Sequence, residues 1–306
     1  MPPPPEMTPF SVTVHPYDSP TRNSCSYELV TATSPTAKNA IVFIGGLTDG
    51  PHTVPSIRTI AHQLATTEAG KALGYSVFEL RMSSSFTAFG YKRLTDDVAD
   101  LSALVKYLRG LGREKIVFLG HSTGCQDSME YAKFVSKGQS PAVDGFILQG
   151  PVSDREAMAP AFQPGMYEKT LAAAEKMIKE GRENEIIHLE GMPEMLESPH
   201  TAYRLHSLIG KNGDDDYFST DLPDERLAAS WGAFNKPVLV LPSGKDEYVP
   251  QTIDVPANIA RWKTFCATGI YSDLSGLIPG ASHSVEQPDS QLWMADRVIR
   301  FLASLQ

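Results

Sequence analysis

The sequence has few cysteines, no long apolar run and no surplus of positive charge. Its 3 cysteines in 306 residues are Cys25, Cys125 and Cys266, and their wide spacing suits neither a disulfide framework nor a metal site. No segment has the ~20 consecutive apolar residues of a membrane-spanning helix. The proline-rich N-terminus has neither the basic nor the apolar region of a secretory signal. We therefore expect a reduced, cytoplasmic protein that holds no metal and needs no cofactor.

The charge balance excludes some classes of partner. The 27 basic and 36 acidic residues give a net charge of −9. Nucleic acids and anionic membranes both require clustered positive charge, so neither is expected as a partner. A neutral or cationic small molecule is compatible with this charge, although solubility alone would also explain the acidic surplus. The apolar fraction of 42% is ordinary for a soluble globular protein.

Strands and helices alternate along most of the chain. An antiparallel pair is expected at 11–17 and 26–32, because apolar and polar residues alternate there. The apolar runs and helical stripes that follow predict a mostly parallel sheet with helices on both faces. Further strands are expected at 40–44, 75–82, 115–119, 145–149, 237–241 and 275–278, and helices at 56–72, 94–108 and 291–305.

One segment interrupts the alternation. Residues 152–231 are helix-rich and stand between two predicted strands, so we interpret them as a cap inserted into a core formed by 1–151 and 232–306. The alternative is a separate small domain. A parallel sheet places its chemistry at the carboxyl ends of its strands, and this favours a lid over that edge.

The most informative motif is Gly120-His121-Ser122-Thr123-Gly124, which follows an apolar strand and precedes a helix. Gly-x-Ser-x-Gly in this context is the nucleophile-elbow pattern, in which a serine sits on a sharp strand-to-helix turn. Glycines are needed where the turn brings backbone segments close together. Ser122 is therefore the candidate nucleophile, and His121, which should point away from it, is expected to have a packing role.

A serine nucleophile needs a base and a group that orients the base, in the chain order serine, acid, histidine. Asp246 follows the strand at 237–241 and is the candidate acid, with Glu247 as the alternative. His283 lies in a small-residue loop before the last helix and is the candidate base. The other histidines lack this context; His52 and His200 are kept as candidates for lining the pocket.

The oxyanion of an acyl-transfer intermediate needs backbone N–H donors. One donor is expected from Thr123, which follows the nucleophile, and the other from the loop after the strand at 40–44. Leu47 is the candidate there, with Gly46 as the alternative, since the Gly45-Gly46 pair allows amides to turn inward.

These blocks resemble an α/β-hydrolase from residue 40 to the C-terminus. More narrowly, two motifs resemble a fungal group that includes the intracellular siderophore esterases; they are Phe43-Ile44-Gly45-Gly46-Leu47-Thr48-Asp49-Gly50 and Gly120-His121-Ser122-Thr123-Gly124-Cys125-Gln126-Asp127. Members of that group hydrolyse ester bonds of fusarinine-type hydroxamate siderophores such as triacetylfusarinine C and fusarinine C. The resemblance implies that Ser122, Asp246 and His283 fall on the triad positions of the family.

The resemblance implies a serine esterase that opens a ferric siderophore and aids intracellular iron release, with iron as part of the substrate. Two alternatives remain. One is a general carboxylesterase or thioesterase that acts on other acyl esters. The other is a ligand-binding protein that kept the fold and lost turnover.

Overall fold

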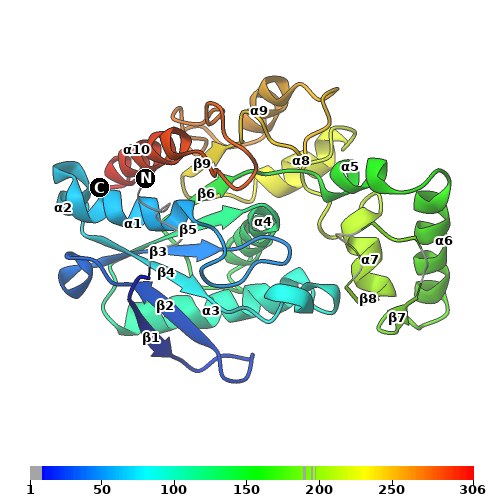
Figure 1. Ribbon diagram of the computed structural model, residues 1–306, viewed down its shortest axis with the longest axis horizontal. Coiled ribbons are helices and arrows are strands. Elements are labelled where there is room, and N and C mark those ends of the chain that lie inside the picture. The colour runs from blue at the N-terminus through cyan, green and yellow to red at the C-terminus, as the bar shows by residue number, and fades with distance from the viewer. Residues whose placement is uncertain (1–8, 189–190, 194–195, 197) are drawn as a thin grey trace.

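The computed structural model describes residues 9–188, 191–193, 196 and 198–306. Within these residues one sheet has seven strands, namely β1 (Val12–Pro16), β2 (Cys25–Leu29), β3 (Asn39–Ile44), β4 (Tyr75–Leu80), β5 (Lys115–His121), β6 (Gly145–Gln149) and β9 (Val238–Leu241). Their order is β1-β2-β4-β3-β5-β6-β9 (Figure 1). β2 pairs antiparallel with both β1 and β4, whereas the remaining neighbours are parallel. The predicted antiparallel pair and mostly parallel sheet are both present.

Helices cover both faces of the sheet, as the continuous apolar strands require. In β3, Ala40, Val42 and Ile44 face one apolar cluster, whereas Ile41 and Phe43 face the other, because successive side chains of a strand point to opposite faces. One face carries α1 (Ser56–Thr66), α2 (Glu68–Leu73) and α10 (Pro288–Ser304), and the other carries α3 (Leu94–Gly110), α4 (Thr123–Ser136), α8 (Asp224–Trp231) and α9 (Val255–Thr264).

Two expected elements differ from the structure. The helix expected over 56–72 is broken at Thr67, which has an extended backbone and accepts a hydrogen bond from the Gly70 N–H, so that it caps a second helix. The strand expected at 275–278 is wrong, since this segment makes only an isolated bridge between Ile278 and Ser243. The Ser275 hydroxyl, rather than a backbone carbonyl, accepts from the Val240 N–H at 3.0 Å, which interrupts the ladder.

The first part of the segment between β6 and β9, up to Ile209, forms the projection at one end of the molecule in Figure 1, whereas α8 at its end packs against the sheet. It contains α5 (Asp154–Met158), α6 (Met166–Lys179), α7 (Ala202–Ile209) and the short antiparallel pair β7 (Ile186–Ile187) and β8 (His200–Thr201). These helices share an apolar cluster that is distinct from the two clusters against the sheet. A short 3₁₀ segment at Ala159–Ala161 follows α5, and two others occur outside this part of the chain, at Ser34–Thr36 and Phe86–Gly90. The position is that of the predicted cap; its action as a lid stays a prediction.

A buried arginine ties this segment to the core. Arg204 on α7 donates through Nε to the carbonyl of Phe89 at 2.9 Å and pairs with the buried Asp215. A charge this deeply buried is tolerated because it is paired and hydrogen-bonded. None of the described helices is long and apolar enough to cross a membrane.

Candidate active site

Ser122 occupies a strained turn between β5 and α4. Its backbone has φ 53° and ψ −123°, a region that L-residues rarely adopt and that often marks a functional site. The flanking glycines are required by close contacts, since a Cβ on Gly120 would lie 2.2 Å from the carbonyl oxygen of Gly124, and one on Gly124 would lie 2.2 Å from that of Ile44. The Ser122 N–H donates to the carbonyl of Gln149 on the adjacent strand at 3.0 Å. The predicted elbow geometry is thus present.

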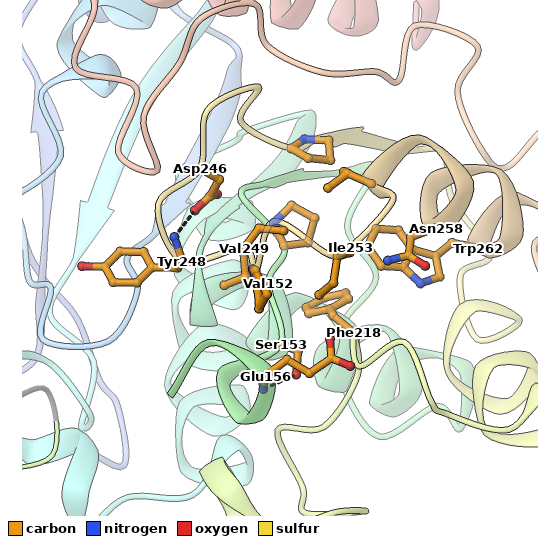
Figure 2. A pocket seen from close by; sticks show the side chains of 14 residues that line it. Val152, Ser153, Glu156, Phe218, Asp246, Tyr248, Val249, Ile253, Asn258 and Trp262 are labelled. Atoms are coloured by element: carbon orange, nitrogen blue, oxygen red, sulfur yellow. Dashed lines mark hydrogen bonds between the residues drawn. The ribbon is translucent and has the colours of Figure 1, made fainter. Parts of the chain in front are cut away.

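Asp246 and Glu247 both reach His283, but at different atoms. The Nδ1 of His283 lies 2.8 Å from Oδ2 of Asp246, and both side chains are buried. Oε2 of Glu247 instead accepts from the backbone N–H of His283, also at 2.8 Å. The other oxygen of Asp246 accepts from the Tyr248 N–H at 3.1 Å, as the dashed line in Figure 2 shows. Of the two candidate acids, Asp246 is therefore the one that orients the imidazole.

Ser122 and His283 line one cavity of about 190 Å³ at the carboxyl end of the sheet. The loop after β3 lies against Ser122, because a Cβ on Gly46 would come within 2.6 Å of the Ser122 Cβ. Gly150 leaves room for the imidazole, since a Cβ there would lie 3.2 Å from Cε1 of His283. The loops after three different strands therefore converge on the serine and the histidine.

The side chain of Asp49 occupies one of the two backbone N–H groups considered as oxyanion donors in the loop after β3. The Gly46 N–H donates to Oδ2 of Asp49 at 2.8 Å, so the alternative oxyanion donor is already engaged. Among the described residues, the N–H groups of Leu47 and Thr123 have no hydrogen-bond acceptor. The side chain of Leu47 packs against the apolar cluster of α5–α7, which anchors its loop. These contacts favour the predicted pair Leu47 and Thr123.

Gln149 links the two histidines of the site and was missed in the sequence. Its Oε1 lies 2.5 Å from Nδ1 of His121, and its Nε2 donates to the backbone carbonyl of His283 and to the Ser243 hydroxyl, both at 3.1 Å. The signal available in the sequence was a polar residue at the carboxyl end of the apolar strand that pairs with the elbow strand.

His121 was expected to have a packing role, and the structure places its ring beside that of His283 in the cavity. Its ring centroid is 4.9 Å from that of His283, and the residue lines the cavity. Burial first, and then the neighbouring His283, lower the pKa of His121 to about 4. Its imidazole is therefore neutral at pH 7. The other two candidates lie elsewhere, since His52 bonds Glu79 and His200 bonds the carbonyl of Ser198.

Tyr248 forms one wall of the site. Its ring stands edge-on to the imidazole of His283, with centroids 4.8 Å apart. Together with Val152, it also borders a second, smaller pocket of about 30 Å³, which Phe218 and Trp262 line (Figure 2). No group of three or more His, Cys, Asp or Glu side chains suited to a metal ion occurs in the part of the chain that the structure describes.

A mostly parallel sheet with a serine elbow and an Asp–His pair at its carboxyl edge defines an α/β-hydrolase, as the sequence predicts. The known proteins agree. The solved siderophore hydrolase EstB from Aspergillus fumigatus is 27% identical, with a TM-score of 0.79 over 98% of both chains.

Two curated proteins are also similar. Fusarinine C esterase sidJ of Aspergillus fumigatus is 28% identical over 90% of this chain and 92% of its own. A UPF0613 protein of Schizosaccharomyces pombe is 30% identical over 90% of both chains. The family model described as "Protein of unknown function (DUF1749)" matches residues 4–303, so the chain belongs to this family. The predicted resemblance to the fungal esterase group is confirmed, and the protein is a carboxylic ester hydrolase that acts on a small-molecule ester.

Proposed function

We propose that the protein is a cytoplasmic serine esterase that hydrolyses ester bonds of fusarinine-type hydroxamate siderophores and so aids intracellular iron release. The observation that carries the proposed chemistry is the 2.8 Å contact between Asp246 and His283, beside the strained Ser122 in one cavity. The substrate class is supported by the fusarinine C esterase and the siderophore hydrolase among the similar proteins.

In the proposed first step, His283 accepts the proton of the Ser122 hydroxyl through Nε2 as the oxygen attacks the ester carbonyl. Asp246 accepts from Nδ1–H, which leaves Nε2 unprotonated and stabilises the imidazolium that forms. The amides of Leu47 and Thr123 bind the oxyanion, and each such donor contributes about 3 kcal/mol to the transition state. His283 then protonates the leaving alkoxide, which gives an acyl-enzyme.

Deacylation uses the same groups. His283 activates a water molecule, the water attacks the acyl-enzyme, and Ser122 recovers its proton as the acid is released. Iron enters as part of the substrate. Opening the triester ring of the siderophore converts a hexadentate chelator into weaker fragments that release the metal. We propose that residues 152–231 act as the cap that closes over this reaction.

The test is mass spectrometry of ferric triacetylfusarinine C and fusarinine C after incubation with the wild type and with Ser122→Ala. Ser136→Ala is a matched control, because this serine lies on the same helix α4 and its hydroxyl bonds only the carbonyl of Lys133 among the described residues. Hydrolysis by the wild type and the control, but not by Ser122→Ala, is expected. Substantial turnover by Ser122→Ala would refute the nucleophile.

The same protein variants, given other substrates and a labelling reagent, separate the alternative functions. Turnover of simple acyl esters or thioesters without turnover of either siderophore would indicate a general carboxylesterase or thioesterase. A ligand-binding protein without activity would leave Ser122 unlabelled by a fluorophosphonate. The intact geometry around Ser122 and His283 leads us to expect labelling.

A further inference from the structure

The helix that follows the elbow carries a residue that the proposed chemistry does not use. Gln126 lies fully buried on α4, one turn after Ser122, and its Nε2 donates to Oδ2 of Asp154 at 2.7 Å. Asp154 is the first residue of α5, where the chain leaves the core after β6. Helix α4 therefore holds the first side chain of α5, within the predicted cap, through a hydrogen bond.

Asp154 is 6% exposed and lines the same cavity as Ser122 and His283. Among the described residues only Oδ2 of Asp154 accepts a hydrogen bond, that from Gln126, so Oδ1 is left without a donor at the edge of this cavity. A carboxylate oxygen that is this buried and unpaired is costly unless a donor from outside the protein satisfies it. Oδ1 of Asp154 is therefore available to accept a hydrogen bond from a ligand in the cavity.

The electrostatics of the cavity indicate which donor fits. No lysine or arginine occurs among the described residues that line it, whereas a second carboxylate, that of Asp49, does. His121 contributes no charge at pH 7, because its pKa is lowered to about 4. Burial, and then Asp215, raise the pKa of Asp154 well above its usual range, while Arg204 opposes this. An incoming cation would reverse this burial penalty, since an opposite charge favours the ionised carboxylate.

We infer that Asp154, held by Gln126, binds a protonated amine carried by the ester substrate and so determines which esters the enzyme prefers. This inference rests on the proposed esterase function and adds the chemical class of its substrates. A charged donor is favoured over a neutral amide N–H because hydrogen bonds to charged groups contribute roughly twice as much as neutral ones. The contact orients the substrate from the cap side of the cavity while the glycine loop binds the reacting carbonyl.

The test uses three esters with one skeleton, which carry a primary amine, the N-acetylated amine, or no nitrogen. Their kcat/KM values are measured for the wild type, for Asp154→Asn and for Asp273→Asn. Asp154→Asn keeps the shape and an acceptor for Gln126 but removes the charge. Asp273→Asn makes the same change on an exposed carboxylate that pairs with Lys263 and does not line the cavity.

The wild type and Asp273→Asn should prefer the amine ester, and Asp154→Asn should lower kcat/KM for that ester about tenfold or more. The other two esters should change by less than about threefold, a difference at the level of a weak neutral hydrogen bond. Equal losses on all three esters, or a wild type without preference for the amine, would overturn the inference while leaving the esterase intact. A preference for the N-acetylated ester would also overturn it. Failure of the proposed function is distinguishable: loss of the esterase chemistry would leave all three esters intact in the wild type, and failure of the siderophore assignment alone would show in the siderophore incubations and not in the ranking of these esters.

A second variant keeps the inference testable if Asp154→Asn does not fold. Gln126→Met removes the hydrogen bond that positions Asp154 but keeps its carboxyl group. We expect a smaller loss that is confined to the amine ester. An unchanged preference in this variant would contradict the positioning of Asp154 by Gln126.

Discussion

Nε2 of Gln149 donates to the backbone carbonyl of His283 at 3.1 Å, across a sequence separation of 134 residues. Oε1 of Gln149 contacts Nδ1 of His121, and the backbone carbonyl of Gln149 accepts a hydrogen bond from the Ser122 N–H. One residue at the end of β6 therefore joins the elbow to the loop that carries the histidine. Hydrogen bonds behind a catalytic group hold it in its productive orientation.

Gln149→Leu removes these side-chain hydrogen bonds. We expect kcat to fall about tenfold with little change in KM, because misplacement of the imidazole affects the transition state more than substrate binding. Steady-state kinetics and the rate of fluorophosphonate labelling of Ser122 measure the effect. Gln291→Leu removes another buried glutamine, one that joins α10 to Thr59 on α1, and should leave kcat unchanged. Equal losses in both variants would indicate a general effect on stability.

Asp246→Asn and Glu247→Gln separate the two carboxylates of the acid loop. Asp246 contacts the imidazole, so Asp246→Asn should lower kcat on the order of 10⁴-fold by favouring the wrong tautomer. Glu247 holds only the backbone of His283, and a neutral glutamine still accepts that hydrogen bond. Glu247→Gln should therefore keep activity within about tenfold. The opposite ranking in kcat would show that Glu247 is the orienting acid.

Asp49→Ala frees the Gly46 N–H and loosens the loop that presents the Leu47 amide. We expect kcat to fall by roughly 10²-fold, as for the loss of one oxyanion donor, while the substrate affinity changes little. Asp49→Asn retains an acceptor for Gly46 and should recover most of the activity. If Asp49→Asn were as impaired as Asp49→Ala, the carboxylate charge rather than the loop geometry would be responsible.

Asp97 makes the stability of the protein depend on pH. Burial, partly offset by hydrogen bonds from Ser84, raises the pKa of Asp97 from 3.8 to about 7. The folded protein therefore binds more protons than the unfolded chain between these values, and this contribution to stability is lost as the pH rises from about 4 to about 7. Asp97→Asn removes the titration and keeps an acceptor.

Urea unfolding at pH 5 and pH 8 measures this effect. The difference in free energy of unfolding between Asp97→Asn and the wild type should be more favourable to the variant at pH 8 than at pH 5. Identical pH dependence of the free energy of unfolding in both proteins would contradict the raised pKa.

Local sequence predicted most of the framework. The apolar run at 40–44 and the glycines around Ser122 express short-range rules, and the order of Ser122, Asp246 and His283 follows the order known for this fold. The structure has the corresponding strand, elbow and loops. The errors also have local causes. Thr67 caps a new helix inside an apparently continuous one, and the Ser275 side chain interrupts a ladder that the apolar pattern of 275–278 suggested.

The sequence by itself determined the alternation of strands and helices, and with it the edge of the sheet where the candidate residues meet. Only the tertiary structure distinguished Asp246 from Glu247 and placed Gln149 and Asp154 at the site. The physical reason is that backbone conformation follows from neighbouring residues, whereas these hydrogen bonds depend on packing. Gln126 and Asp154 are 28 residues apart, and only the folded chain brings the first residue of α5 to the first turn of α4.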